Sequence, residues 1–552
     1  MNYQKQSSSL FFTLFIVCFC MVLSSCNTSK PTSPEAAEAL QSIIPKPTSV
    51  EATGETFILS EASGIFVEGG SEEVLLIGKY LSDRLKTATG FELPISVSES
   101  NGEQAKGNIL LTLAGADASL GDEGYTLTIT GKSIILAANK SAGLFRGIQT
   151  IRQLLPAKVE LSSKQEGPWE IATAAIRDLP SYSYRGSMLD VGRHFFGVED
   201  VKRYIDMISY YKMNVLHLHL SDDQGWRIEI KSWPNLTKHG GSTQVGGGKG
   251  GFYTQEQYKE IVAYAQSRYI TVIPEIDMPG HTNAALASYG ELNGGTIVPL
   301  EGRIELKKED QILNGKSKPT ELYTGIGVGF STLRIEKEET FKFVNDVIRE
   351  LAAITPGPYI HIGGDESHAT KKEDYIEFVK RFREIVQANG KIMIGWEEIA
   401  QGDIGEDVIA QFWTSPKYGE LAAEKGSKLI MSPSKKTYMD MQYDSTTRLG
   451  LHWAAYIEVD SAYSWDPTDY LNGVSKENIL GIEAPLWTET IVTMNDIEYM
   501  IFPRLSGYAE IGWSSNEKKS WDEYKVRLAN HGPRWKAMNI DYYKSKLVQW
   551  KE

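Results

Sequence analysis

Cysteine is scarce in this chain of 552 residues, and the three that occur, Cys18, Cys20 and Cys26, all lie near the start. The long remainder therefore has no pair of thiols from which to build a disulfide. It must fold through side-chain packing, for which a hydrophobic fraction of 41% is sufficient. A chain of this length exceeds one ordinary core, so we expect two domains.

A basic surface is also missing from the sequence. The net charge is -14, and no lysine- or arginine-rich run occurs. Such a chain would repel phosphate backbones, which argues against nucleic acid as a partner.

The N-terminal region has the pattern of an export signal. An apolar stretch at residues 10–23 follows Lys5 and is too short to span a bilayer comfortably. It ends in Leu-Ser-Ser-Cys at residues 23–26, which resembles the processing box of bacterial lipoproteins, with Cys26 as the lipid-modified residue. We expect residues 1–25 to be a lipoprotein-type signal peptide, and the exported protein to be anchored through Cys26, facing the periplasm or the cell surface. An ordinary signal peptide with an incidental cysteine is the alternative.

Two regions precede the largest part of the chain. Residues 26–42 are rich in Ser, Thr, Pro and Ala without an apolar period, and are predicted to be a flexible tether after the anchor. Residues 43–178 predict a small α+β domain, with a strand at 109–113, a hairpin at 125–137 and a helix that Pro156 ends. This domain has no cluster of acids or histidines, so we expect it to provide structural support.

The remainder, residues 179–552, alternates apolar runs with amphipathic helices. Eight runs are predicted to be strands: 187–191, 214–220, 270–276, 359–362, 391–395, 408–412, 428–431 and 481–486. This rhythm predicts an α/β fold, a (β/α)8 TIM barrel that follows the small α+β domain. An open doubly wound sheet is the alternative, but it would more often show a glycine-rich phosphate turn after its first strand.

The most informative motif is His-Ile-Gly-Gly-Asp-Glu at residues 361–366, where two neighbouring carboxylates follow a short apolar strand. Two adjacent carboxylates are hard to ionise together, so Asp365 and Glu366 are expected to divide into one ionised and one protonated group. This arrangement suits acid/base chemistry. The alternative is a loop that merely exposes two acids.

Polar and aromatic residues follow the predicted strands throughout this region. They are Arg193-His194, Asp222-Asp223, residues 277–281, Asp365-Glu366, residues 396–398, Trp413, residues 438–440 and residues 487–489. In a barrel these positions converge on one mouth. Tryptophan rings stack on sugar faces and carboxylates accept hydroxyl protons, so the set predicts a sugar pocket.

Four motifs resemble those of the family 20 glycoside hydrolases, the β-N-acetylhexosaminidases, and the resemblance covers nearly all of the mature chain. They are residues 189–196 (LDVGRHFF), 217–226 (HLHLSDDQGW), 274–281 (PEIDMPGH) and 361–366 (HIGGDE). The resemblance implies an exo-acting, retaining glycosidase without metal or cofactor. Its substrates would be glycoconjugates or chitooligosaccharides with a terminal β-linked N-acetylhexosamine, and the nucleophile would be the substrate's own acetamido group, through an oxazolinium intermediate.

The resemblance also implies roles for five catalytic residues. Glu366 would protonate the leaving oxygen and then activate water. Asp365 would hold the acetamido N–H, while Tyr438 would donate to the acetamido oxygen. His281, backed by Asp222, would form a relay that tunes Glu366; a histidine that merely caps a turn is the alternative for His281.

Polar substrate contacts are implied at the closed end of the pocket. By the family pattern, Arg193 and Glu489 would bind ring hydroxyls and Asp440 the 6-hydroxyl. This supports release of a monosaccharide, although the family also contains enzymes that release disaccharides. The charged segment 300–319 departs from the pattern as an inserted loop, and it leaves linkage preference open.

Aromatic substrate contacts are implied for four tryptophans. Trp487 would be the floor on which the sugar stacks. Trp396 and Trp413 would enclose the acetyl methyl group, and Trp453 would shape the entrance.

Two other classes of protein are compatible with parts of the sequence. A metal-dependent hydrolase could use His217, His219, His281 and His361 as ligands. A lipid-anchored glycan-binding protein without turnover could share the fold, but binding alone does not require Asp365, Glu366 and Tyr438 together. The sequence leaves the choice between glucosamine and galactosamine epimers open, as well as the oligomeric state.

Overall fold

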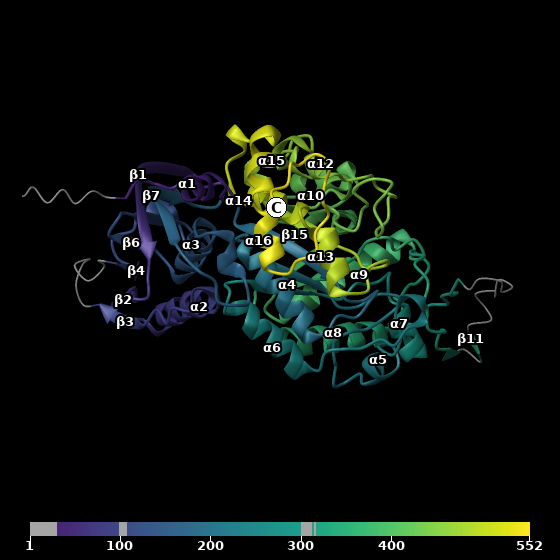
Figure 1. The fold of residues 1–552 in the computed structure, drawn as a ribbon. Coiled ribbons are helices and arrows are strands. Elements are labelled where there is room, and N and C mark those ends of the chain that lie inside the picture. Colours follow the sequence, from purple (N-terminus) through teal and green to yellow (C-terminus); the bar gives the residue numbers. More distant parts are fainter. Residues whose placement is uncertain (1–29, 99–106, 300–311, 314–315) are drawn as a thin grey trace, which may run out of the picture.

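Eight parallel strands close into a barrel in the computed structural model, which describes residues 30–98, 107–299, 312–313 and 316–552 (Figure 1). Around the barrel the strands are β10 (Thr271–Glu275), β13 (Tyr359–His361), β14 (Ile392–Trp396), β15 (Val408–Phe412), β16 (Lys428–Met431), β17 (Ile479–Leu486), β8 (Tyr184–Asp190) and β9 (Val215–His219). Each strand overlaps one of the eight predicted runs, so the predicted barrel is confirmed. These strands read as apolar runs because both of their faces are buried.

Helices follow the strands and cover the outside of the barrel (Figure 1). The larger ones are α4 (Val198–Tyr210), α6 (Gln255–Gln266), α8 (Glu338–Ile354), α9 (Lys372–Ala388), α10 (Pro416–Glu424) and α14 (Arg504–Trp513). Helix α6 begins with a capping box, in which Thr254 accepts from the Gln257 backbone N–H and the Gln257 side chain accepts from that of Thr254. Within the described part of the chain, no helix is long and apolar enough to cross a bilayer.

The small domain lies beside the barrel and contains a mixed seven-stranded sheet (Figure 1). Its strand order is β1 (Ser49–Leu59), β7 (Trp169–Asp178), β5 (Tyr125–Ile129), β6 (Ser133–Ala138), β4 (Asn108–Thr112), β2 (Ile65–Glu68) and β3 (Ile95–Ser98). Helices α2 (Glu72–Thr89) and α3 (Ser141–Leu154) contribute apolar side chains to its core. The predicted α+β character, the hairpin and the helix are all present.

The predicted tether is wrong over part of its length. Residues 34–41 form helix α1 (Pro34–Gln41), which packs on β7 and α3 through the buried side chains of Ala36 and Leu40. Ser33 caps the helix by accepting a hydrogen bond from the backbone N–H of Ala36. The expected signal peptide and Cys26 lie outside the described residues, as does most of the segment 300–319.

A buried polar cluster joins the two domains. Asp178, at the end of β7, accepts hydrogen bonds from Lys212 (2.9 Å), Tyr125 (2.7 Å) and the Trp513 indole N–H (2.7 Å). The Asp178 and Lys212 side chains are fully buried, so loss of either one would leave the other as an uncompensated buried charge. Trp513 ends α14 of the barrel domain but packs into the core of the small domain. The small domain is thereby fixed against the barrel.

Candidate active site

A cavity of about 260 Å³ opens among the loops that follow the barrel strands. Eight of the residues predicted for the site line it: Arg193, Asp365, Glu366, Trp413, Tyr438, Trp453, Trp487 and Glu489. Ile326, Val328 and Leu451 complete the lining. The structure therefore brings together residues from widely separated parts of the sequence, and none of the described residues of the small domain contributes to this cavity.

The loop that carries the two carboxylates has an unusual backbone. After β13, Gly363 and Gly364 have φ angles of 68° and 96°, and Glu366 has a φ of 45°. A Cβ atom on Gly363 would lie 1.9 Å from Oδ1 of Asp277, so only glycine fits there. The same Asp277 oxygen accepts a hydrogen bond from the Gly364 N–H (3.0 Å). Asp277 and the carboxylate loop are thus fitted against each other.

His281 connects both carboxylates to Asp222. Its Nδ1 atom lies 3.3 Å from Oδ1 of Asp222, and its Nε2 atom lies 3.6 Å from Asp365 and 3.4 Å from Glu366. The side chain is 1% exposed. Burial alone would lower the pKa of His281, but Asp222 and then Asp365 raise it well above its ordinary value. The imidazole therefore carries a proton next to Glu366.

The two adjacent carboxyls differ in acidity, as the sequence predicts for such a pair. Burial raises the pKa of Asp365, and Glu366 adds to the increase. For Glu366 burial also acts upward, but the hydrogen bond and charge of His281 outweigh it and lower the pKa. Glu366 also keeps 26% of its side chain in water. In the free protein, Glu366 is consequently the more acidic of the two.

Asp277 is a protonated carboxyl beside Asp365. Burial and the charge of Asp365 raise the pKa of Asp277 well above its ordinary value. One polar atom each of Asp277, His281 and Asp365 lie within 4.8 Å of one another, so a proton on Asp277 relieves the repulsion between the two carboxyls. With Asp277 as the protonated partner, Asp365 can keep its charge.

Arg193 is fixed from two sides at the other end of the cavity. Its guanidinium lies 2.8 Å from Asp222 and 4.7 Å from the ring centroid of Trp487. The charge of Asp222 thus serves both Arg193 and His281. Burial raises the pKa of Glu489, which lines the same cavity, although Arg193 acts in the opposite direction. Asp440 is also buried, and burial together with Glu489 raises its pKa.

Aromatic rings form the walls of the cavity. Trp413 stacks with Tyr438 at an interplanar angle of 12°, and the Trp453 ring meets both edge-on. Trp453 is 56% exposed, whereas Trp487 is 8% exposed. Trp396 does not reach the cavity surface, because its indole N–H bonds to Glu275 inside the barrel and its ring lies behind Trp487.

The other three histidines considered as metal ligands, His217, His219 and His361, belong to a hydrogen-bonded network in the barrel interior. Glu275 lies 3.1 Å from His217, 2.5 Å from His219 and 3.0 Å from His361. Burial disfavours a charge on His217, but Glu483 and Glu275 raise its pKa to about 9. These side chains lie close enough together to surround an ion. However, Nδ1 of His217 and both ring nitrogens of His219 already make hydrogen bonds with carboxylates, so the geometry favours a structural network.

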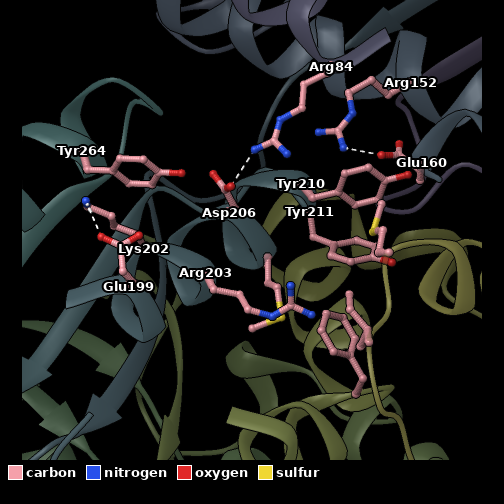
Figure 2. Close-up of a pocket in the computed structure, with 14 residues that line it drawn as sticks. Arg84, Arg152, Glu160, Glu199, Lys202, Arg203, Asp206, Tyr210, Tyr211 and Tyr264 are labelled. Carbon is pink, nitrogen blue, oxygen red and sulfur yellow. Dashed lines mark hydrogen bonds and ion pairs between the residues drawn. The ribbon is translucent and has the colours of Figure 1, made fainter. Parts of the chain in front are cut away.

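A separate cleft of about 410 Å³ lies at the junction of the two domains, away from the barrel mouth (Figure 2). Figure 2 shows its charged side chains engaged with one another: Arg84 with Asp206, and Arg152 with Glu160. No residue of the carboxylate loop lines this cleft. The smaller cavity at the barrel mouth is therefore the candidate active site.

Two side chains at the site, Asp277 and Glu398, belong to the residues that the sequence places after strands, but no individual role was predicted for them. Asp277 lies two residues after β10, and Asp222 lies three residues after β9. Glu398 accepts hydrogen bonds from the Trp413 indole N–H at 3.2 and 3.1 Å. No sequence pattern shows that contact, because the two residues follow different strands.

Comparisons with known proteins agree with this site. Residues 182–516 match the family described as glycosyl hydrolase family 20, catalytic domain, and residues 40–179 match domain 2 of the same family. A β-N-acetylhexosaminidase of Cellulomonas fimi is 38% identical over 92% of this chain and 97% of its own.

Solved structures are similar over nearly the whole chain. The Streptomyces plicatus N-acetyl-β-hexosaminidase in complex with Thio-NAglucal has 48% identity and a TM-score of 0.86, covering 95% of this chain and 99% of its own. A mutant of that enzyme in complex with product (GlcNAc) has 48% identity and a TM-score of 0.85, with the same coverage.

Proposed function

The chain belongs to glycosyl hydrolase family 20 and is a β-N-acetylhexosaminidase, and from this premise we propose how its residues remove a terminal N-acetylhexosamine. The sugar's acetamido oxygen attacks its own anomeric carbon, which forms an oxazolinium intermediate and expels the leaving group. Water then opens the intermediate, and two displacements at one carbon retain its configuration.

One observation carries this proposal: both carboxylates of the loop meet the same imidazole nitrogen. His281 Nε2 lies 3.6 Å from Asp365 and 3.4 Å from Glu366, so both carboxyls are held toward one buried imidazole. A mechanism with an enzyme nucleophile needs two carboxyls that flank the glycosidic bond about 5 Å apart. Here both acids are adjacent in the sequence and contact the same histidine, which leaves Asp365 to aim the acetamido group, and the substrate's own acetamido group supplies the nucleophile.

Glu366 and His281 deliver the proton as a pair. In the free protein the proton is on His281, because its pKa is raised while that of Glu366 is lowered. A bound sugar would cover the exposed quarter of the Glu366 side chain and remove its water. Desolvation favours the neutral carboxylic acid, so the proton moves to Glu366, which donates it to the leaving oxygen. The same carboxylate then accepts a proton from the attacking water.

Asp365 and Tyr438 aim the acetamido group. Both line the cavity, and Tyr438 is 2% exposed. Burial raises the pKa of the Tyr438 phenol well above its ordinary value, which keeps it a hydrogen-bond donor to the acetamido oxygen. Asp365 accepts from the acetamido N–H and balances the positive charge of the oxazolinium ring.

The test compares three aryl β-glycosides: the N-acetylglucosaminide, the N-acetylgalactosaminide and the plain glucoside. We expect cleavage of at least one N-acetyl substrate, with retained configuration, and no cleavage of the glucoside. Equal cleavage of the glucoside, or inverted product, would refute the proposal. The two N-acetyl substrates also determine the epimer preference, and natural substrates would be glycoconjugates or chitooligosaccharides.

We further propose that the enzyme is exported and anchored through a lipid on Cys26. The apolar stretch 10–23 and the Leu-Ser-Ser-Cys box support this proposal. Labelled palmitate should enter the wild-type protein in bacteria but not the Cys26→Ser variant. Equal labelling of both proteins would contradict the anchor.

A further inference from the structure

A second cavity lies next to the catalytic pocket. Its volume is about 430 Å³, against about 260 Å³ for the catalytic pocket. Two side chains line both cavities, Glu366 and Trp413. The Trp413 indole therefore forms part of the partition between them, and its position decides how much room the catalytic pocket has.

Two neighbouring acids hold Trp413, each in a different way. Glu397 accepts from the backbone N–H groups of Trp413 (2.8 Å), Thr414 (3.0 Å) and Ser415 (2.6 Å). Glu398 accepts from the indole N–H, with both of its oxygens within 3.2 Å. Glu397 thus fixes the backbone, while Glu398 fixes the direction of the ring.

The Glu398 carboxyl is a group that the catalytic steps do not use. It lines the second cavity and lies at the N–H edge of the indole, whereas Tyr438 stacks on a face of the ring. Burial, and then the neighbouring Glu397, raise the pKa of Glu398 well above its ordinary range. A neutral carboxyl contacts the indole without bringing a charge into the wall of the catalytic pocket.

We propose that Glu398 is a positioning residue that holds the Trp413 indole in place and thereby limits the length of the N-acyl group that the enzyme accepts. The inference rests on the proposed function, in which Asp365 and Tyr438 bring the acyl group toward Trp413. With the indole held, an acyl chain longer than acetyl meets the ring. Without the hydrogen bond, the ring can move into the second cavity and the longer chain fits.

The test uses aryl β-glucosaminides with N-acetyl, N-propionyl and N-butyryl groups. A rigid apolar wall discriminates by about 10- to 200-fold for each methylene, so the wild type should lose at least about tenfold in kcat/KM at each added carbon. In Glu398→Ala, the butyryl-to-acetyl ratio should rise about tenfold or more. Glu398→Gln keeps a neutral acceptor for the indole N–H and should retain the wild-type ratio.

Lys372→Ala is the matched control, because Lys372 also lines the second cavity but makes no hydrogen bond to Trp413 among the described contacts. This variant should keep both the wild-type ratio and the wild-type rate. An unchanged ratio in folded Glu398→Ala would overturn the inference, as would equal use of all three substrates by the wild type.

Calorimetric binding of free N-acetyl- and N-butyrylglucosamine separates this inference from the proposed function. If the wild type cleaves none of the substrates, the proposed function fails, and the affinity ratio of the two sugars still tests the role of Glu398. A ratio that shifts in Glu398→Ala but not in Glu398→Gln supports it. The same ratio in all three proteins overturns it.

Discussion

Replacing Gly363 by alanine should disable the enzyme although no ionisable residue is replaced. The added Cβ atom would lie 1.9 Å from Oδ1 and 2.2 Å from Cγ of Asp277. Asp277 would have to move, and its 3.0 Å hydrogen bond from the Gly364 N–H would be lost. Because Asp365 and Glu366 follow directly, they would move with the loop.

The expected loss in the free energy of unfolding has two parts, which a control variant separates. An alanine at positive φ costs about 1 to 2 kcal/mol, and a buried polar group that loses its hydrogen-bond partner costs about 1 to 3 kcal/mol. Gly390 has a φ of 72°, close to the 68° of Gly363, but a Cβ there would meet nothing within 4 Å. Gly390→Ala should therefore show only the first cost, and Gly363→Ala the sum of both.

Urea unfolding and aryl glycoside hydrolysis measure the two consequences. Gly363→Ala should be less stable than Gly390→Ala by about 1 to 3 kcal/mol, and its kcat should fall about 100-fold, the effect of a 1 Å misplacement of catalytic groups. Gly390→Ala should keep the wild-type kcat. If the two variants match in kcat, the fit between Asp277 and the carboxylate loop does not position the catalytic groups.

Three further predictions follow from the site. Glu366→Gln should lower kcat/KM about 10²- to 10⁴-fold for poor leaving groups while sugar binding persists; an undiminished rate would remove Glu366 from proton transfer. Asp222→Asn removes the charge that raises the pKa of His281, so His281 should lose its proton at lower pH and the alkaline limb of kcat/KM should move to lower pH, with an unmoved limb as the contrary result. Dialysis against a strong chelator should leave activity intact, because carboxylates already engage Nδ1 of His217 and both ring nitrogens of His219, whereas loss of activity that zinc restores would favour the metal-dependent alternative.

Much of the fold could be predicted, because buried parallel strands are apolar on both faces and stand out between amphipathic helices. The error at residues 34–41 shows where composition misleads. A run of Ser, Pro and Ala looked like a linker, yet Ser33 and Pro34 form a helix start, and Ala36 and Leu40 have the four-residue spacing of one helical face. The tertiary contact with β7 and α3 decides that this short helix forms.

The sequence allowed us to predict which residues line the site, but not the charges that they carry. Eight predicted residues line one cavity, since strand ends converge in a barrel. The adjacency of Asp365 and Glu366 predicts that their acidities differ, but not which one is the more acidic in the free protein. That depends on His281 and Asp277, which come from another loop and lie within contact distance only after folding.

The most direct test of the account is the rate of hydrolysis for a series of aryl glucosaminides whose acetyl group carries no, one, two or three fluorines. Fluorine withdraws electrons from the acetamido oxygen and weakens it as a nucleophile, and each fluorine adds less volume than a methylene group would. The account predicts that kcat/KM falls with every added fluorine. A rate that stays constant across the series would contradict attack by the acetamido group.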